Sequence, residues 1–292
     1  MIMNLNKQRV NPNPVISVVM SVYNSERYVR EAIDSIINQS FADFECIIVD
    51  DGSTDGTKDI IRSYDDGRIV LVENRHDFIE SLNMGMKRAK GKYIARMDAD
   101  DIMHPDRLKI QHTIMETEPS ITVCGTWMNI FGNDTSNRVF GIGDGLIEFP
   151  LLMFLQSFFI SNSSTMIHSD FLRKNRIQYR KEYVYAEDYK LWIEVAMHGG
   201  TFYVESQPLV NYRISESQVT KRKRGEQKAA SEQILREILY YLLDKNSECY
   251  PELTTFSKSL SELHKKELIS FAEMLQMAHR ILHTNKNRLS LA

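Results

Sequence analysis

Val-Ile-Ser-Val-Val-Met-Ser-Val-Tyr-Asn occupies residues 15–24, and this stretch decides the fold. Its first eight residues are apolar apart from Ser17 and Ser21, and most are β-branched, which is typical of a strand buried on both faces. Such strands belong to parallel sheets, because helices cover both faces of a sheet of that kind. The polar residues Tyr23 and Asn24 then mark the carboxyl end of the strand.

The same pattern returns three times in the following hundred residues. Apolar runs stand at residues 45–49, 69–72 and 92–97, and apolar residues recur at helical spacing over 26–38, 55–64, 79–89 and 105–116. Strands that alternate with helices predict an α/β fold with helices on both faces of the sheet. Right-handed crossovers place the carboxyl ends of the parallel strands at one edge, where ligands bind in such folds.

The remainder of the chain is less regular, and its composition changes near residue 224. Short strands are predicted at 165–167, 201–204 and 209–212, and a helix at 187–197. Residues 227–243 and 257–282 have the pattern of two amphipathic helices. We therefore predict two domains, an α/β domain at 1–222 and a helical C-terminal extension at 223–292.

Composition narrows the class of protein. The chain has 292 residues, of which 42% are apolar and 26% charged, as is ordinary for a globular protein. A net charge of −3 argues against nucleic acid as a partner. Cys46, Cys124 and Cys249 are scattered and odd in number, which argues against a disulfide framework and favours a reducing compartment.

No segment has the pattern of a signal peptide or a membrane span. Residues 1–14 are polar, and the most apolar stretch, 146–160, is shorter than the about 20 residues that a span needs. We therefore expect a cytoplasmic protein. The basic run at 221–224 leaves two interpretations open: peripheral contact with the inner face of the membrane, or a solvated face beside helices that cap the domain or form a homodimer.

Acidic residues gather at the carboxyl ends of two predicted strands. One strand ends in Asp50 and Asp51, and another in Asp98, with Asp100 and Asp101 after it. Carboxylates packed at one sheet edge repel one another, so they need a cation, protonation or solvent. If the chain stays extended, Asp98 and Asp100 share one face and suit Mg²⁺ or Mn²⁺ together with substrate phosphates. The alternative is a solvated acidic turn.

Two other segments admit both a structural and a functional interpretation. The turn at 50–56 caps the next helix, while its Asp51 could contact a base and a ribose. Glu187 and Asp188 begin a helix, where acids suit the helix dipole, or one of them is a general base. Trp192 lies on the helical face of Asp188, either in the core or as a platform for a sugar. Spacing alone favours the structural interpretation for Glu187, Asp188 and Trp192.

Several other catalytic classes lack their motifs. The sequence contains no His-Glu-x-x-His, no nucleophile elbow, no P-loop and no Gly-x-Gly-x-x-Gly, which weighs against hydrolases, P-loop kinases and dinucleotide-binding enzymes. His76, His104 and His168 are near the predicted cleft. A lone histidine is more often a polar surface or capping residue than a ligand.

Three motifs in order, at residues 15–24, 47–56 and 91–101, closely resemble family 2 glycosyltransferases, and a looser match extends to about residue 215. The resemblance implies the GT-A fold, a Rossmann-like mixed sheet with helices on both faces, and inversion at the anomeric carbon. It also implies which residues bind a nucleotide sugar: the backbone around Val22 and Tyr23, the side chains of Glu26 and Asp51, and Asp98 at the ribose or metal site.

The same resemblance implies a divalent metal and a catalytic base. Asp100 would ligate Mn²⁺ or Mg²⁺ on the diphosphate. Residues 185–192 look like the family's Glu-Asp motif, so Asp188 becomes the base, while Glu187 and Trp192 line the acceptor side. Arg107 is similar to an arginine common in this subgroup, with no role assigned.

The sequence departs from the family pattern at one place. Relatives often carry Tyr-Arg-x-His, whereas residues 211–216 here place Ser215 at the position of the histidine. Metal ligation is then weaker, or Glu216 or His168 compensates.

These expectations describe an inverting glycosyltransferase that moves a sugar from a nucleoside-diphosphate sugar to a hydroxyl of a glycan or lipid-linked acceptor. UDP-sugars are the family's commonest donors, and surface polysaccharide or glycoconjugate synthesis is the expected role. Two alternatives remain: a non-catalytic nucleotide-sugar-binding scaffold, and a sugar-phosphate nucleotidyltransferase, for which a glycine-rich phosphate loop is missing.

Overall fold

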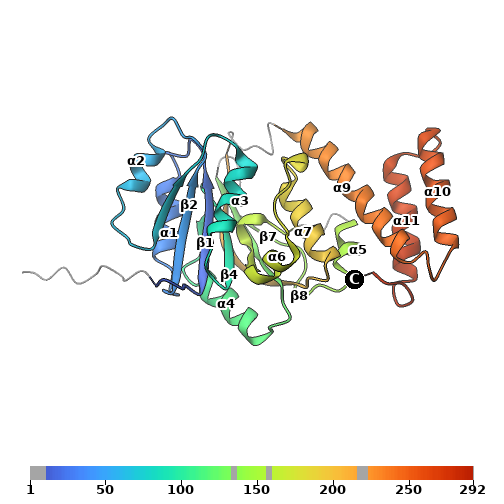
Figure 1. Cartoon of the computed structure of the whole chain (residues 1–292), viewed down its shortest axis with the longest axis horizontal. Helices are drawn as coiled ribbons and strands as arrows, with labels where there is room; N and C mark the ends of the chain where they lie inside the picture. The colour runs from blue at the N-terminus through green and yellow to red at the C-terminus, as the bar shows by residue number, and fades with distance from the viewer. Residues whose placement is uncertain (1–10, 133–136, 156–159, 216–222, 292) are drawn as a thin grey trace, which may run out of the picture.

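A mixed sheet runs through the centre of the molecule, with helices on both faces (Figure 1). The computed structural model describes residues 11–132, 137–155, 160–215 and 223–291. Ten strands form the sheet in the path β3-β2-β1-β4-β9-β6-β10-β5, with β7 paired to β6 and β8 paired to β10. The predicted α/β fold with a mixed sheet is confirmed.

The first half of the sheet is parallel and matches the predicted strands. It consists of β1 (Ile16–Val22), β2 (Phe44–Asp50), β3 (Ile69–Glu73) and β4 (Tyr93–Asp98). Strand β1 pairs with both β2 and β4, so their carboxyl ends meet at one edge. The helices between them are α1 (Val29–Ile37), α2 (Thr57–Arg62) and α3 (Phe78–Arg88), and α4 (Arg107–Thr117) follows β4.

Two hydrophobic clusters, one on each face, hold these layers together. Helices α1 and α4 pack on one face, and α3 packs on the other. Gly85 lets α3 approach closely, because a Cβ there would lie 2.4 Å from Val19 Cγ1. Close packing between helix and sheet of this kind fixes the position of α3 relative to β1 and β2.

The second half of the sheet departs from the predicted pattern. Strand β9 (Met166–His168) runs antiparallel between β4 and β6 (Val123–Gly132), and β10 (Phe202–Ile214) is parallel to β6. The two predicted strands at 201–204 and 209–212 are one strand, whose register shifts between Glu205 and Val210. Pro208 lies at that irregularity, and proline cannot donate a ladder hydrogen bond.

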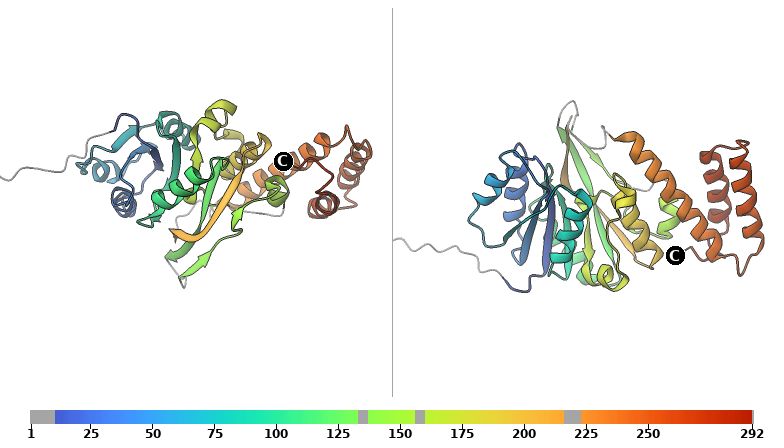
Figure 2. Two further views of the ribbon diagram at one scale, coloured as in Figure 1. Left: turned by 90° about the horizontal axis from the view of Figure 1, so that it is seen from below. Right: turned by 45° about the horizontal axis from the view of Figure 1, so that its top comes forward.

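Short elements complete this half. They are β5 (Ile102–Met103), β7 (Arg138–Phe140), β8 (Gly145–Leu146), α5 (Pro150–Leu155), α6 (Ser169–Asn175), α7 (Glu187–Met197), and the 3₁₀ turns η1 (Asn162–Ser164) and η2 (Lys181–Tyr183). The end of the β6–β10 pair projects from the body of the molecule (Figure 2). The predicted helix at 187–197 has the bounds of α7.

The C-terminal region holds three helices where two were predicted. They are α9 (Arg224–Lys245), α10 (Glu252–Lys265) and α11 (Phe271–Thr284), at the end of the molecule away from α1 and α2 (Figure 1). The predicted helix at 257–282 is broken because Glu267 adopts φ 57° and Ser270 starts α11 with a capping box to Glu273.

The apolar faces of the C-terminal helices join the same cluster as α5 and α7. The predicted domain boundary at 222 lies in residues 216–222, outside the described part, and the division stays a prediction. No helix among the described residues is long and apolar enough to cross a membrane.

Candidate functional site

A tight acidic turn follows β4. The amide of Asp101 donates to the carbonyl oxygen of Asp98 at 3.3 Å, so the chain turns after Asp98 and does not stay extended. The expectation of an extended Asp98-x-Asp100 pair is therefore wrong in detail. The turn forms because Asp101 points inward, where Ser163 Oγ donates to Oδ2 at 2.5 Å and the Arg213 amide to Oδ1 at 2.9 Å.

The three carboxyls of this turn disfavour one another's charge. Burial raises the pKa of Asp100 to about 6, and the charge of Asp98 adds to the shift. Burial also raises the pKa of Asp101 well above its ordinary value, again with help from Asp98 and Asp100. Surrounding protein atoms reduce the hydration of the Asp98 carboxyl and so raise its pKa as well, although 41% of its side chain is exposed. Such a group of oxygen ligands suits a hard cation that neutralises it.

Two buried arginines lie behind the acidic turn. Arg96 Nη2 is 3.4 Å from Asp98 Oδ1, and its other amino group donates to the Val19 carbonyl. Arg107 Nη2 donates to the carbonyl oxygens of Arg96 at 2.9 Å and Thr165 at 3.0 Å. Burial lowers the pKa of Arg107 to about 9, and the nearby acids oppose that shift. Arg107 thus positions the strand that ends in Asp98 and does not project toward a ligand.

Helix α7 presents Glu187 and Asp188 near this acidic turn. Tyr185 precedes them in the left-handed region, with φ 72°, a strained conformation for a bulky residue. Burial raises the pKa of Glu187 to about 8, with a contribution from the charge of Asp188. Burial raises the pKa of Asp188 to about 6, partly offset by the amide of Tyr189, while Asp98 adds to the shift.

Electrostatic coupling shows that two elements distant in sequence meet here. The charge of Asp98, at the end of β4, contributes to the raised pKa of both Glu187 and Asp188. Oε2 of Glu187 is buried and has no hydrogen-bond partner among the residues that the structure describes. A buried carboxyl oxygen without a hydrogen bond costs free energy. A ligand that donates a hydrogen bond to this oxygen, or accepts one from it, would therefore be favoured.

The expected nucleotide-binding residues lie at the ends of β1 and β2. Val22 is buried, and its carbonyl accepts from the Asp51 amide at 2.8 Å. Oδ1 of Asp51 accepts from the Asp77 amide and from Ser81 Oγ, both at 2.7 Å. Tyr23 is 45% exposed at the rim. Asp51 is thus fixed by the start of α3, and its other oxygen faces His76 at 3.4 Å.

The turn after β2 is largely structural. Glu26 Oε2 accepts from the Gly56 amide at 2.7 Å, and the Glu26 amide donates to Asp55 at 3.1 Å. Asp55 also accepts from Thr57, and these hydrogen bonds outweigh burial to lower the pKa of Asp55. Glu26 therefore braces this turn, and a contact between its side chain and a nucleotide stays a prediction.

Other candidates lie away from this edge. Trp192 is 1% exposed within the core, as the structural interpretation expected, so its side chain forms no surface platform for a sugar.

His168 pairs with Tyr93, at the opposite end of β4 from Asp98, and cannot compensate for Ser215. His104 accepts from the Asp106 amide at the start of α4. Ser215 is buried, and Glu216 lies outside the described residues.

The structure adds residues that the motifs did not single out. Tyr179 is buried and donates to Asn162 Oδ1 at 3.0 Å, and burial raises its pKa to about 12. Burial and the charges of the acidic turn also raise the pKa of Tyr212. Arg96 carried the clearest signal in the sequence, since it is a charged residue inside an apolar strand. Tyr179 stands outside the recognised motifs, whereas Tyr212 is the tyrosine of the segment that is compared with Tyr-Arg-x-His.

The acidic turn provides oxygen ligands for a divalent cation without a complete set. Within the described ranges, no group of three His, Cys, Asp or Glu side chains could hold a metal ion. Mg²⁺ and Mn²⁺ commonly use one or two carboxylates and complete their shell with substrate phosphates and water. The chemistry of Asp98 and Asp100 fits that mode of binding.

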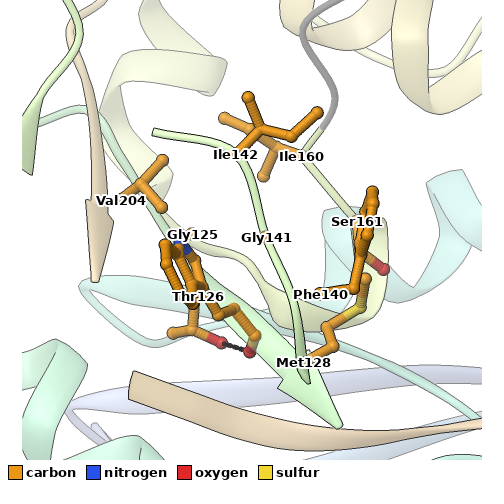
Figure 3. Close-up of a pocket in the computed structure, with 10 residues that line it drawn as sticks. Gly125, Thr126, Met128, Phe140, Gly141, Ile142, Ile160, Ser161 and Val204 are labelled. Carbon is orange, nitrogen blue, oxygen red and sulfur yellow. Dashed lines mark hydrogen bonds between the residues drawn. The ribbon is translucent and has the colours of Figure 1, made fainter. Parts of the chain in front are cut away.

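The pocket in Figure 3 is too small to be the ligand site. It lies between β6, residues 140–142 and residues 160–161, and apolar side chains such as Ile142, Ile160 and Val204 surround it. It belongs to the packing of the projecting strands.

Comparisons with known proteins give related sequences. A family model described as glycosyl transferase family 2 matches residues 17–176. An uncharacterized glycosyltransferase of Haemophilus influenzae is 35% identical over 80% of this chain and 75% of its own length. A protein of Bacillus subtilis provisionally named a teichuronic acid biosynthesis glycosyltransferase, TuaG, is 29% identical over 73% of this chain and 84% of its own length.

Two solved structures are similar in fold. The 1–349 fragment of Staphylococcus aureus TarS, in complex with UDP-GlcNAc, has a TM-score of 0.62 at 19% identity, over 89% of this chain and 81% of that one. A mannosyltransferase of Pyrobaculum calidifontis, in complex with GDP-Man and Mn²⁺, has a TM-score of 0.59 at 16% identity, over 95% of this chain and 76% of that one.

Proposed function

Since the chain belongs to glycosyl transferase family 2, we propose that it is an inverting, metal-dependent glycosyltransferase that moves a sugar from a UDP-sugar to an acceptor hydroxyl. One arrangement carries this proposal: β1 pairs parallel with β2 and β4, so the acids that follow these strands meet at one edge of the sheet, and the charge of Asp98 there reaches Glu187 and Asp188 at the start of α7. A donor diphosphate and an acceptor hydroxyl need groups of these two kinds close together.

Asp188 is the general base in this proposal. Its pKa, raised by burial to about 6, lies close enough to neutral pH for it to be ionised and still accept a proton effectively. The acceptor hydroxyl transfers its proton to Asp188 as its oxygen attacks the anomeric carbon. The nucleoside diphosphate leaves from the opposite face with the electrons of the broken bond, so a single displacement inverts the configuration.

Glu187 has a different role from its neighbour. Burial raises its pKa to about 8, so at neutral pH it is mostly protonated and able to donate a hydrogen bond to a bound acceptor. Its unpaired Oε2 is available for a sugar hydroxyl on the acceptor side. Two adjacent carboxyls whose pKa values are pushed apart can thus serve as donor and base at the same time.

Asp100 and Asp98 would hold the divalent cation on the donor diphosphate. A bound cation supplies Lewis-acid stabilisation of the charge that grows on the leaving phosphate. The Mn²⁺ in the mannosyltransferase complex supports this assignment. Val22, Tyr23 and Asp51 would contact the base and ribose, at the sheet edge where ligands bind in such folds.

The polysaccharide role and the UDP preference rest on similarity. TuaG is named for teichuronic acid synthesis, and the TarS fragment binds UDP-GlcNAc. These names support a UDP-sugar donor and a cell-surface glycan acceptor. Family membership favours this function over a nucleotidyltransferase.

The test is a turnover assay with UDP-sugars and candidate glycan acceptors in Mn²⁺. Release of UDP together with a product of inverted anomeric configuration, read by NMR, is the expected result. A product of retained configuration would overturn the single displacement. Binding of UDP without turnover in the presence of all tested acceptors would favour the scaffold alternative.

A further inference from the structure

A groove runs along α3 on the face of the sheet that also carries α6. Its volume of about 930 Å³ is within the range of ligand sites and far exceeds that of the pocket in Figure 3. One wall is α3 from Glu80 to Lys87, and the other consists of α6 and residues 176–182. Asn83 donates to the Tyr179 carbonyl oxygen at 3.0 Å and accepts from the Tyr179 amide at 2.9 Å, so the separation of the walls is fixed.

One end of this groove lies beside the start of α7. Lys181, in one wall, pairs at 2.5 Å with Asp77, the N-cap of α3. Burial raises the pKa of Tyr179 to about 12, and the charges of Asp188 and Glu187 add to the shift, so this lining residue lies near the acids of α7. The other end lies at α6, beside the amino end of β4. The wall that leads from α6 to α7 therefore runs antiparallel to α3.

Unpaired charges of opposite sign lie at the two ends of the groove. Glu80 and Glu182 line the end near α7. Lys87 lines the end near α6, and Arg176 lies toward the same end, because it directly follows α6. Glu80 and Lys87 are about two turns of α3 apart, which corresponds to roughly 10 Å along the helix axis. The groove is thus acidic near the catalytic residues and basic away from them.

The two cations of the basic end are available to a ligand. No ion pair or hydrogen bond joins the Lys87 ammonium or the Arg176 guanidinium to any residue that the structure describes, and both residues are exposed. The other three cations that line the groove are each paired with an acid. Lysine and arginine bind carboxylate and phosphate groups through charge-assisted hydrogen bonds. The basic end therefore suits one anionic group.

The floor of the groove argues against an acyl chain as the occupant. Its apolar side chains are almost fully buried, since Ile94, Leu172 and Ile177 are 2%, 3% and 5% exposed. They leave little apolar surface for a lipid tail to cover. Gln178 is exposed in the same wall as Arg176, and its amide can both donate to and accept from hydroxyl groups.

We propose that this groove binds the acceptor as an anionic oligosaccharide, with a carboxylate or phosphate group at Lys87 and Arg176 and the reacting hydroxyl at the end near α7. The inference rests on the proposed function and deepens it, because it states the chemical class of the acceptor. Glu80 and Glu182 repel an anion from their own end and so set the direction in which the chain lies. The anionic group is then at least roughly 10 Å from the hydroxyl that receives the sugar.

The experiment is titration calorimetry with tetragalacturonate, tetra(glycerol phosphate) and neutral maltotetraose. We expect the wild type to bind at least one anionic chain about tenfold more tightly than maltotetraose. Lys87→Gln/Arg176→Asn should remove this preference and leave the affinities for maltotetraose and for UDP in Mn²⁺ unchanged. Asparagine tolerates the left-handed backbone of Arg176, whose φ is 56°, so the wall keeps its conformation.

Arg88→Gln/Lys174→Gln is the matched control, since it removes the same charge from exposed residues that do not line the groove. It should keep the preference, and an equal loss in this control would overturn the inference, because net charge would then explain the binding. Tripolyphosphate in EDTA that binds as tightly as the anionic chains would also overturn it, since the sugar would contribute nothing. Binding to phosphatidylglycerol vesicles without binding to either anionic chain would overturn it in favour of a lipid headgroup.

Failure of this inference is distinguishable from failure of the proposed function. A wild type that binds neither anionic chain more tightly than maltotetraose overturns the inference, while UDP binding in Mn²⁺ and release of UDP in the turnover assay keep the proposed function intact. A wild type that neither binds nor releases UDP overturns the proposed function and, with it, the assignment of the groove to an acceptor.

Discussion

Arg213 Nε donates to the carbonyl oxygen of Asp100 at 2.8 Å, while the Arg213 amide donates to Asp101 Oδ1 at 2.9 Å. One residue of β10 therefore holds the last two residues of the acidic turn that follows β4. The guanidinium lies between the rings of Tyr28 and Phe131, 4.6 and 4.5 Å from their centroids. These contacts link the turn to α1 and β6, so the position of Asp100 depends on three separate elements.

Replacing Arg213 by lysine should displace Asp100. Lysine keeps the charge but loses the planar fork that donates to the carbonyl oxygen while it stacks between two rings. We expect Mn²⁺-dependent UDP affinity to fall about tenfold and stability to fall by about 1–2 kcal/mol. Calorimetry and urea unfolding measure the two effects. Arg62→Lys, at an exposed pair with Glu73, is the control and should change neither. Unchanged UDP affinity in Arg213→Lys would show that Asp100 is positioned without it.

Asp188→Asn should abolish transfer and preserve donor binding. Asparagine cannot accept the proton of the acceptor hydroxyl, so kcat should fall about 10²- to 10⁴-fold, the usual range for a lost general base. The affinity for UDP in Mn²⁺ should stay within about twofold of the wild type, because the donor contacts lie on β1, β2 and the turn after β4. Asp170→Asn, at a surface pair with Arg173, serves as the control. Wild-type turnover by Asp188→Asn would remove Asp188 from the mechanism.

Glu187 should make stability fall as the pH rises. Its folded-state pKa is raised by burial to about 8, so the folded state binds the proton more tightly than the unfolded state does. The resulting stability is fully present below about pH 4.5 and is lost as the pH rises through about 8. Urea unfolding in EDTA at pH 5 and pH 9 should show Glu187→Gln less sensitive to pH than the wild type, by about 1–3 kcal/mol. Equal pH dependence of the two proteins would contradict the raised pKa.

Removal of divalent metal should abolish the stabilisation by nucleotide. Ligand bound to the folded state raises its stability by about 2.7 kcal/mol at a hundredfold excess over Kd. We expect UDP to raise Tm in Mn²⁺ and not in EDTA. Asp100→Asn should lose the shift and raise the Tm of the ligand-free protein, since it relieves repulsion with Asp98. A full Tm shift by UDP in EDTA would argue for metal-independent binding.

Glu237→Gln should weaken the support of α7 by α9. Glu237 accepts from Lys190 Nζ at 2.7 Å and from the Tyr183 hydroxyl, on either side of the Glu187–Asp188 pair in sequence. We expect a loss of about 1–2 kcal/mol in stability and a smaller kcat with unchanged UDP affinity. Glu232→Gln, at a loose surface pair with Lys228, is the matched control. If kcat does not change, the C-terminal helices support the fold without affecting the catalytic edge.

The spacing of apolar residues predicted a helix or strand correctly where that element has a clear periodicity of its own. Strands β1 to β4 lie within one residue of their predicted bounds, and α7 matches the prediction. The expectations failed where non-local contacts decide the outcome. Strand β6 was not predicted, β10 was divided at its irregularity near Pro208, and the break before α11 was missed although Ser270 and Glu273 carry a capping-box signal.

The sequence by itself determined the family, the α/β class and the identities of the acids, because strand-end motifs and apolar spacing are properties of neighbouring residues. Only the tertiary structure decided what each acid can do. It buried Trp192, turned the chain after Asp98, and brought Asp98 within electrostatic reach of Glu187 and Asp188. Burial and the fields of residues about ninety positions away set those pKa values, and neither is present in a local stretch of chain.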